Sequence, residues 1–169
     1  MTDNEDGRRG ACDLAVDVVL FAEPGGVLSV LAIERDKQPF RACLALPGGF
    51  VEAGEAPRVA AARELAEETG VEVAPTGLAE VGSYGTPGRD PRGNVVSIAY
   101  RGYAERAPRA VAASDARAAR WISLHEFLDP AAGVAFDHRD IVGDALAAWL
   151  GEGRVPGEGG TPGTGFPQF

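Results

Sequence analysis

Apolar residues recur along this chain in short runs separated by glycine- and proline-rich turns, a pattern that predicts β-strands. The runs 14–21 and 27–33 flank a turn at 23–26, so we expect them to form a β-hairpin. A shorter run at 43–46 leads into the turn at 47–49. The other expected strands cover 78–84, 94–103 and 119–122.

One stretch follows a helical period instead. Pro57 suits the first turn of a helix, and Gly70 suits its end. At 100° per residue, Glu64, Glu67 and Glu68 fall within an arc of roughly 100°, so three carboxylates share one face. The opposite face is small and mostly apolar and is expected to pack against the sheet; it comprises Val59, Ala62, Leu65, Ala66 and Thr69.

The glutamate cluster suggests a bound cation. Like charges at helical spacing disfavour a helix by a few tenths of a kcal/mol per pair, whereas hard divalent metals such as Mg²⁺ favour oxygen ligands. A solvated acidic face is the alternative interpretation. Arg63, beside the cluster, is expected to hold some of these carboxylates through a forked ion pair.

Two further helices complete the pattern. Ser123 matches a capping box that opens a short helix. Asp137 is the expected N-cap of a final helix over 141–150. Strands and helices in this order predict an α/β fold in which a mixed sheet carries helices on both faces.

Length and charge narrow the classes of function. The 169 residues are expected to form one domain over 11–150, between a polar tail (1–10) and a Gly- and Pro-rich tail (151–169). The net charge of −9 argues against nucleic-acid binding but not against a phosphate substrate, because divalent ions can reverse the local potential. Neither a signal peptide nor a bilayer-length apolar run is found, so we expect a cytoplasmic protein that binds no membrane.

The stretch from Gly49 to Val71 resembles a complete Nudix box. Gly49, five residues, Glu55 and seven residues precede Arg63-Glu64-Leu65-Ala66-Glu67-Glu68-Thr69-Gly70-Val71, and no fixed position is substituted. The resemblance implies an α/β/α sandwich with a mixed β-sheet. It also implies hydrolysis of a nucleoside diphosphate linked to another group, a small-molecule substrate, with Mg²⁺ or Mn²⁺ as cofactor.

The same resemblance assigns roles to residues. It implies metal ligation by Glu64, Glu67, Glu68 and the carbonyl of Gly48. Glu55 would be a supporting carboxylate, and Arg63 would orient the glutamates. Nudix enzymes that act on nucleotide sugars are often dimers, which makes a homodimer an expectation here.

Features beyond the box are similar to bacterial ADP-ribose pyrophosphatases and to Nudix-related regulators of NAD metabolism. Pro87 lies sixteen residues after Val71, and a proline at this spacing resembles the ADP-ribose pyrophosphatases. The segments 83–93 and 135–138 are similar in sequence to both groups. The regulators carry a winged-helix domain after the Nudix domain, whereas only about twenty residues follow the last expected helix here. This favours the enzyme, for which ADP-ribose would yield AMP and ribose 5-phosphate.

Several residues are candidate substrate contacts. Arginine suits bidentate phosphate binding, so Arg35, Arg89 and Arg92 are candidates, with simple exposure as the alternative. Gly49 lets the backbone approach a ligand closely. His138, at the entry to the last helix, is a further candidate, with a structural role as its alternative.

The residue that activates water stays unassigned. Nudix relatives often carry a glutamate just before the Arg-Trp pair that corresponds to Arg120-Trp121, and this chain has alanines there. The candidates are Asp115, Glu105, Glu67 and Glu68.

Three functions compete: a nucleotide-sugar hydrolase, a nucleoside-triphosphate sanitising hydrolase, and a non-catalytic ligand-sensing domain. A damaged box would be expected for the last of these.

Overall fold

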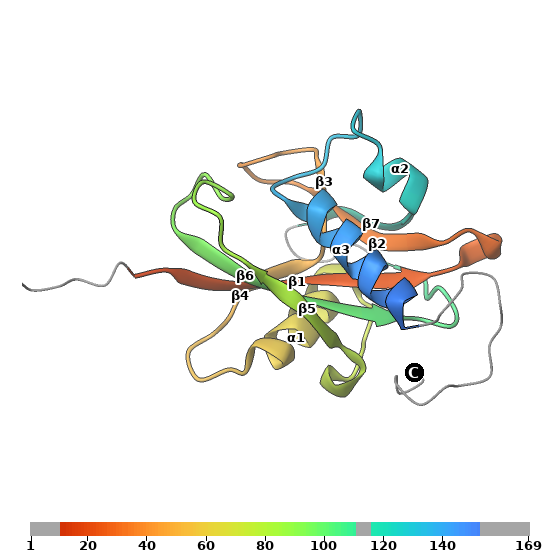
Figure 1. Ribbon diagram of the computed structural model, residues 1–169, viewed down its shortest axis with the longest axis horizontal. Coiled ribbons are helices and arrows are strands. Elements are labelled where there is room, and N and C mark those ends of the chain that lie inside the picture. Colours follow the sequence, from red (N-terminus) through yellow and green to blue (C-terminus); the bar gives the residue numbers. More distant parts are fainter. Residues whose placement is uncertain (1–10, 111–115, 153–169) are drawn as a thin grey trace, which may run out of the picture.

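One mixed sheet organises the fold (Figure 1). The structure is a computed structural model that describes residues 11–110 and 116–152. Within these residues the strands are β1 (Asp13–Ala22), β2 (Ser29–Arg35), β3 (Leu44–Ala45), β4 (Gly48–Phe50), β5 (Ala79–Tyr84), β6 (Val95–Tyr103) and β7 (Ala116–Ser123). The helices are α1 (Pro57–Thr69), α2 (Leu124–Leu128) and α3 (His138–Gly151), with 3₁₀ turns at Pro24–Gly26 and Pro75–Gly77.

Strand β1 lies in the middle of the sheet. The strand order is β3-β2-β1-β6-β5, with β4 also paired to β1 and β7 to β2. β1 runs parallel to β6 and antiparallel to both β2 and β4. Because β2 pairs with the end of β1 and β4 pairs with its beginning, the sheet forks along one edge of β1. The expected β1–β2 hairpin is confirmed.

Both faces of the sheet are covered. On β1, Val19 and Phe21 belong to a core shared with α2 and α3, whereas Val18 and Leu20 belong to a core shared with α1. Figure 1 shows α1 on one side of the sheet and α3 on the other. A strand that is buried on both faces is mostly apolar, which explains the long apolar run in the sequence. The expected α/β/α sandwich with a mixed sheet is confirmed.

Helix α1 presents a narrow apolar stripe to the sheet. It ends before Gly70, which adopts the left-handed conformation at φ 69° and donates its N–H to the carbonyl of Ala66 at 2.9 Å. The buried positions are Ala60, Ala61, Leu65 and Thr69. The prediction that Val59 packs against the sheet is wrong, because its side chain is 46% exposed. Val59 lies about 120° around the helix from Leu65, beyond the edge of the stripe.

The starts of the last two helices differ from each other. Ser123 accepts the N–H of Glu126 at 3.1 Å, so the expected cap of α2 is confirmed. Asp137 is the N-cap residue of α3, as predicted, but its side chain makes no capping hydrogen bond. Arg89 binds both of its oxygens instead, at 2.6 and 2.8 Å. The two charge-assisted hydrogen bonds of this bidentate pair use both oxygens that could have capped the helix.

Strand β7 begins at Ala116, earlier than the expected residue 119. The reason is its partner: β7 pairs with β2 from Ser29 opposite Ser123 to Arg35 opposite Ala116. β7 therefore runs along the whole length of β2, as far as Arg35. None of the helices in the described ranges has the length and apolar character needed to cross a bilayer.

Candidate active site

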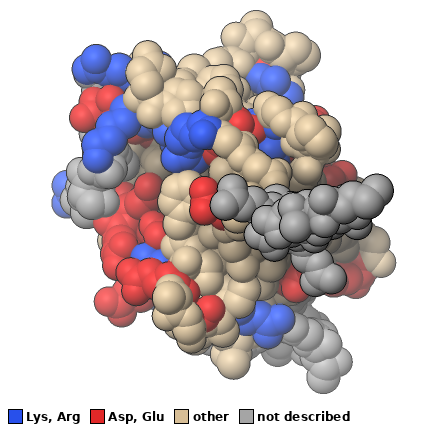
Figure 2. Space-filling model, turned by 90° about the vertical axis from the view of Figure 1, so that its left-hand side faces the viewer, with Lys and Arg blue, Asp and Glu red and all other residues tan. Residues whose placement is uncertain are grey.

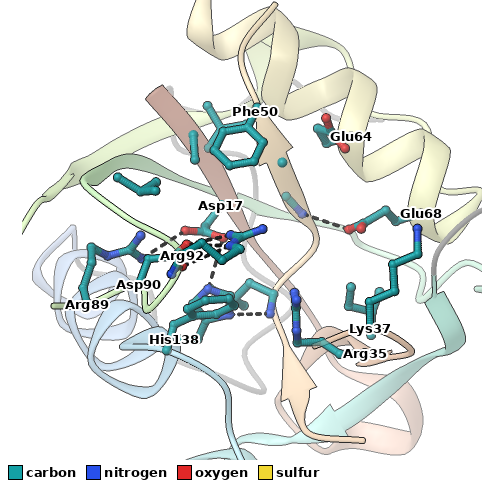
Figure 3. A pocket seen from close by; sticks show the side chains of 18 of the residues that line it. Asp17, Arg35, Lys37, Phe50, Glu64, Glu68, Arg89, Asp90, Arg92 and His138 are labelled. Atoms are coloured by element: carbon teal, nitrogen blue, oxygen red, sulfur yellow. Dashed lines mark hydrogen bonds and ion pairs between the residues drawn. The ribbon is translucent and has the colours of Figure 1, made fainter. Parts of the chain in front are cut away.

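A cavity of about 350 Å³ lies beside the fork in the sheet (Figure 3). Its walls come from β1, the end of β2, β4, one side of α1, the loop 89–92 and the start of α3. A volume of this order suits a small organic ligand. The residues predicted to bind metal or substrate that line it are Arg35, Gly48, Gly49, Glu64, Glu68, Arg89, Arg92 and His138.

The glycine turn at 47–49 is packed too closely for side chains. Gly48 and Gly49 both pair with β1. A Cβ atom on Gly48 would lie 2.1 Å from the carbonyl oxygen of Val16. A Cβ atom on Gly49 would lie 2.4 Å from a carboxylate oxygen of Glu64. The missing side chains therefore let the backbone of the turn lie directly against the acidic side of α1.

The three glutamates of the box differ in burial and in their position relative to the cavity. Glu68 and Glu64 lie about 60° and 100° from Leu65 around the helix, at the margin of its buried stripe. Glu68 accepts the N–H of Gly48 at 2.9 Å. Burial raises the pKa of Glu64, and it raises the pKa of Glu68 to about 8. Glu67, about 160° from Leu65, has a side chain that is 55% exposed and does not line the cavity.

Arg63 connects the carboxylates to one another. Its Nε and Nη2 each bind an oxygen of Glu55 at 2.9 Å, so the forked ion pair forms with Glu55 and not with the glutamate cluster. Its Nη1 binds Glu64 at 2.8 Å and Glu67 at 3.3 Å. Its Nη2 also donates to the carbonyl of Phe50 at 3.2 Å. Arg63 therefore holds α1, the β4 end and the intervening loop in one arrangement.

Two guanidinium groups lie on the other walls of the cavity, as Figure 3 shows. Arg35 donates Nε to a carbonyl of its own loop at 2.8 Å and lies 4.9 Å from the ring centroid of Phe136. Arg92 binds Asp90 at 2.6 Å and lies 5.2 Å from the ring centroid of Phe50. Burial, and next the charge of Arg92, lower the pKa of Arg35. The two cations are thus crowded, which favours an anionic ligand between them.

Asp17, in the middle of β1, is a buried residue at the cavity that was absent from the sequence-based candidates. It accepts the hydroxyl of Ser97 at 2.6 Å, and its carboxylate lies 3.2 Å from His138 and 3.6 Å from Arg89. Burial by itself raises the pKa of Asp17, but these partners together hold it below its usual value. The signal in the sequence was an aspartate within an otherwise apolar strand.

Arg89 and His138 also line the cavity, but their polar atoms bind protein partners. The side chain of Arg89 is 5% exposed and forms the bidentate pair with Asp137. His138 is buried; its Nδ1 accepts the N–H of Leu46 at 2.9 Å, and its Nε2 faces Asp17. These contacts assign both residues to the framework of the cavity, and direct substrate contact by either stays a prediction.

The candidates for activating water lie in different places. Glu68 is in the cavity, whereas Glu67 lies on the helix surface. Glu105 is exposed and does not line the cavity. Asp115 lies outside the described residues. The identity of the base therefore stays open.

A profile of the NUDIX domain matches residues 13–144. The chain belongs to the Nudix family. An ADP-ribose pyrophosphatase from Methanocaldococcus jannaschii is 40% identical over 117 residues, which are 69% of this chain and 65% of that protein. The ADPR responsive transcriptional repressor NtrR from Acinetobacter baylyi is 32% identical over 136 residues, which are 79% of this chain and 53% of that protein. The chain thus spans less than two thirds of either curated relative.

Solved structures agree with the Nudix fold. The NUDIX domain of Shewanella oneidensis NrtR, solved in complex with ADP ribose, superposes with a TM-score of 0.75 at 27% identity. The superposition covers 86% of this chain and 94% of that chain. The curated relative NtrR is a transcriptional repressor, and Shewanella oneidensis NrtR has also been solved with a 27mer DNA. The expected absence of nucleic-acid binding by this chain therefore stays a prediction.

The donor set of this Nudix domain fits a hard divalent cation, and Nudix hydrolases generally use such ions. Glu64 and Glu68 offer carboxylate oxygens at the cavity, and burial raises the pKa of both. In the ranges 11–110 and 116–152, no three His, Cys, Asp or Glu side chains already converge as metal ligands. Mg²⁺ commonly uses one or two carboxylates and keeps several waters, so two glutamates suffice to begin a site. The three-glutamate set stays a prediction.

The surface charges of the Nudix domain are segregated. Figure 2 views the end at which the β5–β6 and β4–α1 loops lie in Figure 1. On this face, lysine and arginine side chains gather above a cluster of acidic side chains. In the cavity, Glu64 and Glu68 lie on α1, whereas Arg35 and Arg92 lie on other walls.

Proposed function

We propose that this Nudix domain hydrolyses the diphosphate bridge of a nucleoside diphosphate joined to another group, with ADP-ribose as its substrate. The observation that carries the proposal is the pairing of charges in one cavity, with Glu64 and Glu68 on α1 and Arg35 and Arg92 on other walls. A diphosphate there would meet cationic side chains and carboxylates able to hold a cation. The pyrophosphatase relative and the ADP-ribose complex support the choice of ADP-ribose.

Mg²⁺ or Mn²⁺ is the proposed cofactor. Glu64 and Glu68 would hold it, with Glu67 and the carbonyl of Gly48 as further ligands. When bound, such an ion neutralises phosphate oxygens and makes water more acidic. The chain's own contribution is to hold the carboxylates in place, since Arg63 binds Glu64 and Glu67 and the amide of Gly48 binds Glu68.

The other residues act on the substrate. Arg35 and Arg92 bind non-bridging phosphate oxygens and stabilise the charge that develops on the leaving phosphate. Gly49 lets the phosphate approach the backbone. The oxygen of water bonds to one phosphorus as the bond from that phosphorus to the bridging oxygen breaks. ADP-ribose and water thus yield AMP and ribose 5-phosphate, and Glu68 is the described candidate placed in the cavity to accept the proton.

Product analysis tests this function. The protein is incubated with ADP-ribose and Mg²⁺, and the products are separated by anion-exchange chromatography. We expect AMP and ribose 5-phosphate in equal amounts without free phosphate. A nucleoside-triphosphate hydrolase would instead leave ADP-ribose intact and convert a triphosphate into a monophosphate and pyrophosphate, which would contradict the proposal.

A second candidate function, sensing of ADP-ribose without hydrolysis, is favoured by the likeness to the repressor NtrR. The two functions differ in what happens to bound ligand. Isothermal titration calorimetry with ADP-ribose in the presence of Mg²⁺ would give a stable binding isotherm for a sensor. A hydrolase would give a continuing reaction heat, and the recovered ligand would be AMP.

A pair of glycine substitutions tests the contact between the turn and α1. Gly49→Ala would collide with the carboxylate end of the Glu64 side chain, whereas Gly48→Ala would collide with the backbone of Val16. We expect Gly49→Ala to keep the parental free energy of unfolding within about 1 kcal/mol, and Gly48→Ala to lose about 1–3 kcal/mol. Displacement of Glu64 should lower hydrolysis by Gly49→Ala at least about tenfold. Denaturant unfolding and initial rates measure both, and a parental rate for Gly49→Ala would contradict the prediction.

A further inference from the structure

A buried polar network connects α3 to the turn that borders the cavity. Ser97 on β6 donates to Asp17 on β1, and Asp17 faces Nε2 of His138 at the start of α3. On its other side, His138 accepts the N–H of Leu46, which is 92 residues earlier in the chain. Asp17, Ser97 and His138 are all buried. Polar groups buried in this way are costly unless they are paired, so the network is specific in its geometry.

The contacts determine which nitrogen of His138 carries the proton. A backbone N–H can only donate, so Nδ1 must be the unprotonated acceptor. Nε2 then carries the proton and donates to the carboxylate of Asp17. Both nitrogens are therefore used inside the protein. His138 has no free nitrogen with which to donate a proton to a ligand or accept one from it.

The backbone that His138 holds runs directly into the glycine turn. The N–H of Leu46 is bound by His138, the carbonyl of Pro47 accepts the N–H of Val18 at 2.8 Å, and the N–H of Gly48 is bound by Glu68. Three successive residues are thus anchored to three different elements. Pro47 has no N–H group that could be held. The Leu46 N–H, which His138 accepts, is therefore the last backbone N–H before that of Gly48.

We propose that His138 is a positioning residue whose Nδ1 holds the amide of Leu46 and thereby sets the place of Gly48 and Gly49 against α1. Asp17 contributes by fixing the orientation and tautomer of the ring, as carboxylates behind functional histidines do. Without the Nδ1 acceptor, the N–H of Leu46 loses its partner, and the turn is released at the end that Glu68 does not hold. The inference rests on the proposed function for its kinetic readout, and on hydrogen exchange for a readout that needs no catalysis.

Two substitutions separate the halves of the contact. His138→Asn places a side-chain oxygen near the position of Nδ1, so it keeps an acceptor for Leu46 and loses the donor to Asp17. His138→Gln places an amide nitrogen near Nε2, so it keeps the donor and loses the acceptor. Tyr84→Phe is the control: it removes a 2.8 Å hydrogen bond to Asp144 on the same helix, away from the cavity lining.

Exchange of the Leu46 amide with deuterium, followed by NMR without substrate or metal, is the first measurement. We expect it to be at least about tenfold faster in His138→Gln than in His138→Asn or the Tyr84→Phe control. Steady-state hydrolysis of ADP-ribose is the second. We expect kcat to fall about 10- to 100-fold in His138→Gln with KM changed less than about threefold, and His138→Asn to stay within about threefold of the parent.

Each outcome decides the matter. Equal loss of kcat in both His138 variants, or parental protection of the Leu46 amide in His138→Gln, overturns the inference. Melting temperatures detect a general loss of folding. Such a loss would lower the protection of amides throughout α3, and not that of the Leu46 amide in particular. If the parent protein does not hydrolyse ADP-ribose, the proposed function fails, and the exchange rates alone still support or overturn the role of His138.

Discussion

Glu68→Gln is expected to lower kcat for ADP-ribose roughly a thousandfold, because several kcal/mol of charge stabilisation are lost and 1.36 kcal/mol corresponds to a factor of ten. Glutamine keeps an oxygen that can accept the N–H of Gly48, which Glu68 accepts at 2.9 Å. It lacks the negative charge that would hold a divalent cation. Initial rates at saturating ADP-ribose with Mg²⁺ at neutral pH measure the effect.

The fold of this variant should be preserved. Glutamine has nearly the size and shape of glutamate and keeps the oxygen that accepts the N–H of Gly48. We expect the free energy of unfolding to change by less than about 1 kcal/mol. Glu72→Gln, at an exposed glutamate just after α1, is the matched control and should keep the parental kcat. A parental kcat for Glu68→Gln would exclude this carboxylate from the reaction.

Removal of divalent cations by a chelator is expected to stop hydrolysis, and Mg²⁺ or Mn²⁺ in excess should restore it. Binding can also be measured without turnover. A ligand at 100 times its Kd stabilises the folded state by about 2.7 kcal/mol, which corresponds to a rise in melting temperature of roughly 5–10 °C for a chain of this size. Thermal unfolding with Mn²⁺, against NaCl of equal ionic strength, measures this rise.

The double variant Glu64→Gln, Glu68→Gln is the control for the cation. It keeps the shape of both side chains and removes the two carboxylates that line the cavity. We expect its melting temperature to be insensitive to Mn²⁺. A rise equal to that of the parent would place the cation elsewhere on the protein, and hydrolysis that survives chelation would contradict the proposed cofactor.

The acidic helix shows how far a local pattern extends. Its start, its end and its helical period were predictable, since they depend on Pro57, Gly70 and the spacing of residues between them. The period placed three glutamates on one face, but it could not show that Glu64 and Glu68 lie at the cavity and Glu67 does not. That difference comes from the sheet, which covers the helix on one side of Leu65.

The arginines show the opposite limit. Arg35, Arg89 and Arg92 were equivalent candidates for phosphate binding in the sequence. In the structure the side chain of Arg89 is 5% exposed and binds Asp137, which is 48 residues away. The carboxylate of Asp137, expected to cap α3, binds Arg89 instead. Arg35 and Arg92 lie on cavity walls with aromatic rings beside them. No local pattern distinguishes these outcomes, because each depends on a partner in a distant element.

By itself, the sequence determined the apolar strands, the helix with its stop signal, and the spacing of residues that marks a Nudix domain. These features depend on neighbours within a few residues, and backbone geometry acts over that range. The tertiary structure alone decided which charges meet. Asp17 and Ser97 are 80 residues apart and Leu46 and His138 are 92 apart, and their contacts exist only because β1 pairs with β6 and α3 packs behind the forked edge of the sheet.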